Sequence, residues 1–227
     1  IELFIVGDSL GMVLMGYETT VPVSMDDMVC HAANVARAGQ NAYRIVDLPS
    51  RSYETPAQAH ANARRLVDEG GAVMVKLEGG VDKVTIVENL VRHDIPFCGH
   101  IGLLPQSVEE LGGYKVQGRD EAGARAIMED ARALQEAGAG MIVMECIPAP
   151  LAATISQSLS IPTIGIGAGR GCDGQVLVLY DMLGITTQKV PRFVKDFLRD
   201  SGTVPAAVEA YIKAVKDGSY PAPEHEY

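Results

Sequence analysis

One stretch of the sequence, residues 73–80 with the order Val-Met-Val-Lys-Leu-Glu-Gly-Gly, decides the fold class. It starts as an apolar, β-rich run and ends in a charged residue and two glycines. Near-continuous apolar runs of this length are typical of strands that are buried on both faces of a parallel sheet. We predict such a strand at residues 73–77, and similar runs predict strands at residues 3–6, 43–46, 96–98, 141–144, 162–166 and 176–179.

Helix signals fill the intervals between these runs. Residues 24–39 begin with an N-cap Ser and end in Gly, and residues 55–71 begin with Thr-Pro and end in Gly-Gly. Residues 120–138 form a long amphipathic stretch that ends in Gly, and the tail at 191–218 predicts two helices separated near Gly202. Strands that alternate with helices predict an α/β fold with a parallel sheet and helices outside it.

The number of strands bears on the choice between a closed barrel and an open sheet. A (β/α)8 TIM barrel needs eight strands and usually about 250 residues, whereas this chain offers seven candidates in 227 residues. Because the chain begins at Ile1 within a strand-like run, we expect one βα unit upstream of it. Residues 1–227 would then form a single, N-terminally incomplete barrel domain, and an open doubly wound sheet is the alternative.

Composition and charge exclude several classes of protein. The net charge is −10, aromatic residues make up 5% and Trp is absent, which argues against a nucleic-acid-binding surface. No apolar run approaches the roughly 20 residues that a membrane span needs, so we expect no membrane partner. The four cysteines show no Cys-x-x-Cys or metal-finger spacing, and we predict reduced thiols and a cytoplasmic protein.

Ionisable residues follow five successive strand predictions. Charged side chains avoid buried strands unless they are paired or bound to metal, and barrel active sites are built at the carboxyl ends of the strands. A charged residue at one strand end can be explained by exposure to solvent. Charged residues at five successive strand ends are harder to explain in this way. The residues are Asp8, Asp47, Lys76 with Glu78, His100 and Glu145.

Three carboxylates of this set, Asp8, Asp47 and Glu78, would repel one another in one barrel mouth unless a cation neutralised them. Ligands that are all oxygen suit a hard ion such as Mg2+. The alternative is ion pairing with Lys76 or an arginine. Zinc is disfavoured, because the five histidines show no ligand spacing.

Two glycine-rich loops are weaker signals. Residues 165–169, Gly-Ile-Gly-Ala-Gly, follow a strand prediction but lack the dinucleotide-binding fingerprint, so they indicate a tight turn or close approach to a ligand. Residues 112–118, Gly-Gly-Tyr-Lys-Val-Gln-Gly, are consistent with either a lid or an ordinary surface loop.

The ordered motifs of the chain resemble the ketopantoate hydroxymethyltransferase (3-methyl-2-oxobutanoate hydroxymethyltransferase) family over essentially its whole length. Any one motif would be weak, but their number and order make chance similarity improbable. The motifs are Val6-Gly7-Asp8-Ser9-Leu10-Gly11-Met12, Asp47-Leu48-Pro49, Lys76-Leu77-Glu78-Gly79-Gly80, Gly99-His100-Ile101-Gly102-Leu103, Pro105-Gln106-Ser107, residues 112–119, Glu145-Cys146-Ile147-Pro148, residues 165–169, Asp181-Met182-Leu183-Gly184 and Val190-Pro191-Arg192-Phe193.

The resemblance implies a (β/α)8 barrel of the phosphoenolpyruvate mutase and isocitrate lyase type. It implies a cytoplasmic transferase of pantothenate biosynthesis that moves a hydroxymethyl group from 5,10-methylenetetrahydrofolate to 3-methyl-2-oxobutanoate and forms 2-dehydropantoate. The resemblance also implies that the enzyme uses Mg2+ and assembles as a homodecamer. The chemistry would be an aldol-type C–C bond formation through an enolate of the 2-oxo acid.

The resemblance also implies roles for individual residues. Asp8, Asp47 and Glu78 fall on metal-site positions, and Glu145 falls on the proton acceptor. The residues that it places at the substrate are Asp8, Ser9, Asp47, Lys76 and His100.

Two departures from the family pattern accompany the resemblance. The N-terminal strand that often carries Thr-Ala-Tyr-Asp is not in this chain, and Ser50-Arg51 stands where an aromatic and a small residue or Met are usual. One alternative function is another Mg2+-dependent lyase or mutase of the superfamily, although Cys98-Gly99-His100 lacks the two lysines expected before the cysteine of such a lyase. The other alternative is a non-catalytic barrel.

Overall fold

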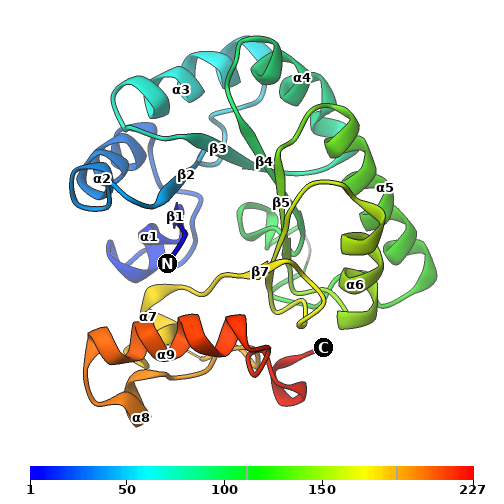
Figure 1. Ribbon diagram of the computed structural model, residues 1–227. Coiled ribbons are helices and arrows are strands. Elements are labelled where there is room, and N and C mark those ends of the chain that lie inside the picture. The colour runs from blue at the N-terminus through cyan, green and yellow to red at the C-terminus, as the bar shows by residue number, and fades with distance from the viewer. Residues whose placement is uncertain (111, 188) are drawn as a thin grey trace.

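A computed structural model describes residues 1–110, 112–187 and 189–227 of the chain, and its centre is one curled, all-parallel sheet (Figure 1). Among the described residues the sheet has seven strands, and their order in space is their order in sequence. Every neighbouring pair is parallel. The strands are β1 (Leu3–Val6), β2 (Tyr43–Asp47), β3 (Met74–Glu78), β4 (Phe97–Gly102), β5 (Met141–Glu145), β6 (Thr163–Ile166) and β7 (Gly174–Gln175).

Helices surround the outer face of the sheet, and a C-terminal group of helices lies near its β1 and β7 edges (Figure 1). The surrounding helices are α2 (Met25–Ala38), α3 (Pro56–Asp68), α4 (Val84–Arg92), α5 (Glu121–Glu136) and α6 (Ala149–Ser158). The shorter and C-terminal helices are α1 (Leu10–Val13), α7 (Leu179–Met182), α8 (Leu198–Ser201) and α9 (Val204–Lys216). Three 3-10 turns complete the assignment: η1 (Val81–Lys83), η2 (Pro105–Ser107) and η3 (Pro223–His225).

The helix starts predicted from capping residues are confirmed. The hydroxyl of Ser24 accepts a hydrogen bond from the backbone N–H of Asp27, whose carboxylate accepts one in return, which forms a capping box. The Thr55 hydroxyl accepts a hydrogen bond from the backbone N–H of Gln58 at the start of α3, and the Asp120 carboxylate accepts one from the backbone N–H of Gly123 at the start of α5. These caps satisfy backbone donors that a helix start leaves without an intrahelical partner.

Two predictions in the C-terminal part are wrong in detail. The strand predicted at 176–179 is displaced, because β7 pairs with β6 only at Gly174 and Gln175 and Leu179 already begins α7. The first of the two predicted tail helices shrinks to the single turn of α8, which ends at Gly202 with φ 73°. Val176 and Leu177 of the displaced run pack against the interior instead of extending the sheet, whereas Leu179 is 53% exposed.

The prediction of a TIM-type barrel is confirmed in the form of a partial barrel. The main apolar core lies between the sheet and its surrounding helices, and its fully buried side chains include Leu66, Leu90 and Leu134. Inside the curl, β1 and β7 are the two edges of the sheet, and both line a cavity of about 2140 Å³ that α9 also borders. Within the described ranges, no helix has the length and apolar character needed to cross a bilayer.

Candidate active site

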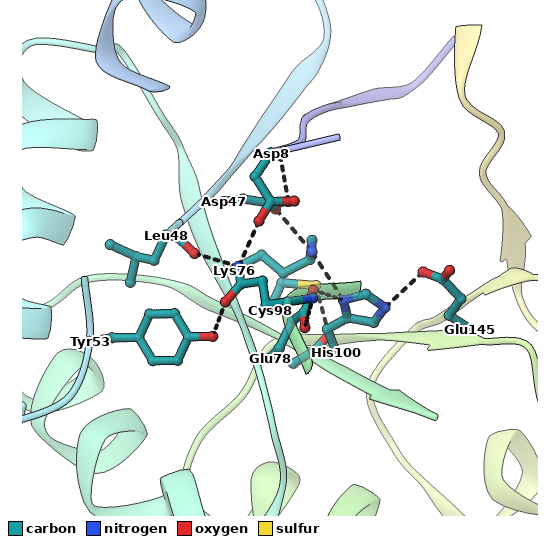
Figure 2. Close-up of polar contacts among 11 residues, drawn as sticks. Asp8, Asp47, Leu48, Tyr53, Lys76, Glu78, Cys98, His100 and Glu145 are labelled. Atoms are coloured by element: carbon teal, nitrogen blue, oxygen red, sulfur yellow. Dashed lines mark hydrogen bonds and ion pairs between the residues drawn. The ribbon is translucent and has the colours of Figure 1, made fainter. Parts of the chain in front are cut away.

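The carboxyl ends of five neighbouring strands, β1 to β5, bring the predicted polar residues together (Figure 2). They meet on the wall of the large cavity. Five of them are only 3–5% exposed, and the sixth, Glu145, has a side chain that is 15% exposed. The group, which we call the polar cluster, consists of Asp8, Asp47, Lys76, Glu78, His100 and Glu145.

Asp47, at the end of β2, contacts residues that follow β1 or lie on β3. The backbone N–H of Asp8 donates to Asp47 Oδ2 at 3.2 Å, and Lys76 Nζ lies 3.0 Å from Asp47 Oδ1. The close approach of β1 and β2 depends on Gly7, because a Cβ there would lie 3.3 Å from Asp47 Oδ2 and 3.3 Å from Ser9 Oγ. Asp47 Oδ1 is buried, and the Lys76 ammonium is its polar neighbour among the described residues.

A row of polar contacts runs from Lys76 through His100 to Glu145, and each donor in it can be assigned. Lys76 Nζ lies 3.2 Å from His100 Nδ1, and His100 Nε2 lies 3.1 Å from Glu145 Oε2. An ammonium group can only donate, so the Lys76 contact assigns Nδ1 of His100 as the acceptor and Nε2 as the protonated nitrogen. His100 therefore donates to the carboxylate of Glu145 and fixes its orientation.

Burial and charge shift the pKa values of these groups. Burial, with the nearby Asp47 charge, raises the pKa of Asp8 to about 7, and burial raises the pKa of Glu145 to about 7. Burial also raises the pKa of Glu78 well above its ordinary value. For Lys76, burial alone would lower the pKa, but the carboxylates of Asp47 and Glu78 outweigh it and raise the pKa. Burial and the Lys76 charge hold the pKa of His100 well below its ordinary value, so its imidazole is neutral.

Ser9 differs from its neighbours in the site. It lies at the N-terminus of α1, where its side chain caps no backbone N–H, and it lines the cavity beside Asp8. The structure therefore places Ser9 next to the polar cluster without giving its hydroxyl a role in the helix.

The sequence did not identify Gln106 as a site residue, although its motif was recognised. Gln106 lies on η2, beyond the end of β4, and its side-chain Nε2 donates to Asp8 Oδ2 at 2.7 Å. Its backbone N–H donates to Glu78 Oε2 at 3.0 Å. Tyr53, also not foreseen, donates from its hydroxyl to Gln106 Oε1. A charged residue directly after a strand is a readable signal, whereas a glutamine on a separate turn is not.

The two glycine-rich loops have different local structures. Gly167 has φ 62°, and a Cβ there would lie 2.6 Å from the ring of Phe193, so this loop is a tight, closely packed turn, as one of the two predicted roles requires. In the other loop, Tyr114 is 58% exposed, lines the cavity, and places its hydroxyl 3.5 Å from Met12 Sδ. Whether that loop acts as a lid stays a prediction.

Solved structures with low sequence identity share the architecture of this chain. A 2,3-dimethylmalate lyase, described as a PEP mutase/isocitrate lyase superfamily member, aligns over 96% of this chain and 76% of its own with a TM-score of 0.54 and 14% identity. A phosphonomutase-like protein from Burkholderia cenocepacia aligns over 72% of this chain and 69% of its own with a TM-score of 0.56 and 18% identity. These likenesses show the fold, a partial (β/α) barrel, and the polar cluster lies at the carboxyl ends of its strands.

Sequence comparison narrows this class to one family. The family model described as ketopantoate hydroxymethyltransferase matches residues 1–223. The 3-methyl-2-oxobutanoate hydroxymethyltransferase of Nitrosococcus oceani is 55% identical over all of this chain and 86% of its own length, and that of Halorhodospira halophila is 52% identical over all of this chain and 82% of its own length. The chain belongs to the ketopantoate hydroxymethyltransferase family and is a transferase.

Proposed function

We propose that this enzyme transfers a hydroxymethyl group from 5,10-methylenetetrahydrofolate to 3-methyl-2-oxobutanoate and forms 2-dehydropantoate, as a step of pantothenate biosynthesis. The observation that carries the proposal is the polar cluster, in which four buried carboxylates face one ammonium and one neutral imidazole at the mouth of a cavity. The names of the relatives support the acceptor, since they are 3-methyl-2-oxobutanoate hydroxymethyltransferases.

The donor set fits a divalent cation of the Mg2+ kind. Asp8 and Asp47 offer adjacent carboxylates, in which Asp8 Oδ2 accepts from Gln106, Asp47 Oδ2 accepts from the Asp8 backbone, and the buried Asp47 Oδ1 has only the Lys76 ammonium beside it, at 3.0 Å. Those ranges contain no group of three or more His, Cys, Asp or Glu side chains arranged to hold a metal. Mg2+ is commonly bound through one or two carboxylates and keeps several waters, so Asp8 and Asp47 would hold it and Glu78 would complete the acidic set.

The metal's contribution would be Lewis-acid stabilisation of negative charge on the keto oxygen of the 2-oxo acid. The protein's own groups would bind and orient that substrate. Lys76 carries a buried positive charge, and Ser9 places a hydroxyl that makes no cap hydrogen bond on the same cavity, so both suit a substrate carboxylate. A substrate held in this way presents its C3–H bond to the cavity, where Glu145 lies.

Glu145 is the group proposed to take the C3 proton. Its pKa of about 7 suits a general base near neutral pH, and His100 holds its carboxylate at 3.1 Å. Removal of the proton leaves an enolate, and its C3 attacks the methylene carbon of the folate donor. The C3–H bond and both bonds from the methylene carbon to the folate nitrogens break, and the methylene carbon gains a bond to C3 and a bond to the oxygen of a water molecule. The C3 proton and one proton of that water end on the two folate nitrogens, which leaves tetrahydrofolate.

A direct assay tests the proposal. The purified chain is incubated with 3-methyl-2-oxobutanoate, Mg2+ and 5,10-methylenetetrahydrofolate, and 2-dehydropantoate is measured, with reactions lacking each component as controls. Product that requires all three supports the proposal. C–C cleavage of a larger 2-hydroxy acid without folate would instead support a lyase, and no turnover of any acid would support a non-catalytic barrel.

The assembly and the location are part of the same proposal. We propose a homodecamer in the cytoplasm, as the sequence resemblance implies. Large apolar side chains that are about half exposed, such as Leu179, Ile185 and Val190, supply surface that an interface would cover. Light scattering during size-exclusion chromatography measures the mass of the particle, and a monomer at micromolar concentration would contradict the decamer.

A further inference from the structure

We propose that Gln106 is a positioning residue of this site, whose side-chain and backbone N–H groups hold Asp8 and Glu78 in the orientation that binds the divalent cation. The inference rests on the proposed function, because it takes the cation site from it. Gln106 belongs to a turn after β4, whereas Asp8 follows β1 and Glu78 ends β3. One residue therefore connects three of the loops that form the mouth of the barrel.

The contacts use both N–H donors of the Gln106 amide, and its oxygen accepts one hydrogen bond. Nε2 donates to Asp8 Oδ2 at 2.7 Å and to the backbone oxygen of Leu48 at 3.1 Å, and Oε1 accepts from the Tyr53 hydroxyl. A flipped amide would set its oxygen against two other acceptors, the Asp8 carboxylate and the Leu48 carbonyl. The surroundings therefore permit only one orientation of this amide, with its donors toward Asp8.

Tyr53, whose hydroxyl contacts Gln106, is itself held in place by its neighbours. Tyr53 is 9% exposed, and the Lys83 ammonium lies 5.9 Å from the centre of its ring. The loop that carries Tyr53 is held by Asn62, whose side-chain amide donates to the backbone oxygen of Ser52 at 2.7 Å. Outer partners that are held in this way orient the groups that bind a metal.

The chemical nature of Gln106 matters as much as its position. Its N–H groups are neutral, so they fix one oxygen of each carboxylate without cancelling the negative charge that attracts a cation. Asp8 keeps Oδ1 and Glu78 keeps Oε1 for other partners, and the latter lies 3.6 Å from His100 Nδ1. A lysine or arginine at position 106 would orient the same carboxylates but would compete with the metal for their charge.

The test measures metal binding without substrate. Mn2+, which suits the same oxygen ligands as Mg2+, is titrated into the metal-free protein, and the free ion is followed by its electron paramagnetic resonance signal. Gln106→Met keeps the length of the side chain and removes its amide. We expect the Mn2+ dissociation constant to rise about 10- to 100-fold, the range seen when an outer partner of a metal ligand is lost.

A matched control separates positioning from general damage. Gln175 is also half-buried on the same cavity, and its amide donates to the backbone oxygen of Gly169 at 3.0 Å, away from the polar cluster. We expect Gln175→Met to bind Mn2+ within about threefold of the unaltered protein. With Mg2+ in activity assays, Gln106→Met should need a higher Mg2+ concentration for half-maximal rate, while kcat at saturating Mg2+ falls much less.

The outcomes are distinguishable. An unaltered protein that binds Mn2+ while Gln106→Met binds it equally well overturns the inference and leaves the proposed function standing. An unaltered protein that binds no Mn2+ overturns both. If Gln106→Met does not fold, Tyr53→Phe removes the single contact that Tyr53 makes to Oε1, and an unchanged dissociation constant in that variant also contradicts the inference, since we expect a rise of about two- to fivefold.

Discussion

Two regions of the molecule bury polar groups in opposite ways. In the polar cluster, ionisable side chains face one another: Lys76 contacts Asp47 and His100, and His100 contacts Glu145. In the C-terminal region, residues 176–227, buried polar groups instead contact neutral partners: the hydroxyls of Tyr211 and Tyr220 donate to backbone oxygens, and the buried Asp181 carboxylate accepts from the Thr186 hydroxyl. Tyr211 contacts Gln175 at 2.9 Å, and Tyr220 contacts Phe193 at 2.7 Å.

This difference indicates that the polar cluster serves activity and that the C-terminal region serves stability. Burying several carboxylates beside one ammonium costs folding free energy, since desolvation disfavours the charged forms. The tyrosine hydroxyls have neutral partners, and their rings pack edge-to-face on Phe197 with centroids 5.5 Å apart, which adds stability. We therefore expect substitutions in the polar cluster to change activity and substitutions in the C-terminal region to change stability.

The largest expected effect is on the activity of Glu145→Gln. Because the amide cannot accept the C3 proton, we expect kcat to fall about 10³-fold, within the range for a lost general base. Exchange of the C3 proton of 3-methyl-2-oxobutanoate with deuterated solvent should fall equally, while Mn2+ binding and circular dichroism stay unchanged. Exchange at the rate of the unaltered enzyme would remove Glu145 from the role of proton acceptor.

The matching substitution in the C-terminal region is Phe197→Ala. Phe197 is 4% exposed and packs on both Tyr211 and Tyr220, so its truncation should lower the free energy of unfolding by about 3–5 kcal/mol. Urea titration measures this loss, and Val204→Ala, at a side chain that is 49% exposed, is the control with little expected change. If Phe197→Ala keeps its stability and its kcat falls as far as that of Glu145→Gln, the proposed division between the two regions is wrong.

The same contrast explains how much the sequence could predict. Asp8, Asp47 and Glu78 were identified because a charged residue directly after a buried apolar run is improbable for a strand alone. The alternation of runs and capped helices gave a parallel α/β sheet, and six of its seven strand positions agree with the structure to within a few residues.

The failures have physical reasons. The run at 176–179 has the composition of a strand, but apolar residues also line interiors without pairing, and the sequence contains no information on which residues find a hydrogen-bonding partner. Gln106 was missed because its role depends on contacts to Asp8, 98 residues earlier in the chain, and to Glu78, 28 residues earlier. Periodicity and local motifs do not report contacts at such separations.

A third prediction concerns pH and again separates the two regions. Glu145 must be ionised to act as a base, so with its pKa at about 7 we expect kcat to rise about tenfold per pH unit below 7 and to level off above it. A profile that stays flat between pH 5 and 8 would contradict this assignment. Phe197→Ala should keep the shape of the profile, because the groups that we propose for the reaction lie outside its region.

The stability of the metal-free protein should fall as the pH rises, whereas kcat should increase. The folded-state pKa of Glu145 lies above its ordinary value, so the folded state binds the proton more tightly. The stability gained in this way is complete below about pH 4 and is lost as the pH rises through about 7. Glu145→Gln has no such loss, and at pH 8 we expect it to exceed the unaltered metal-free protein by up to about 3 kcal/mol, with little difference at pH 4. Equal urea midpoints at pH 8 would contradict the cost of burying this charge.

The smallest expected effects compare two serines that both begin helices. Ser24 caps α2 through its hydroxyl, whereas the Ser9 hydroxyl caps nothing and lines the cavity. Ser24→Ala should therefore lower the free energy of unfolding by about 1 kcal/mol and leave KM unchanged. Ser9→Ala should leave stability within about 0.5 kcal/mol and raise KM for the 2-oxo acid about five- to tenfold, which corresponds to the net contribution of one hydrogen bond of about 1 kcal/mol. If Ser9→Ala loses stability and keeps its KM, its hydroxyl serves the fold, and the substrate carboxylate must be bound without it.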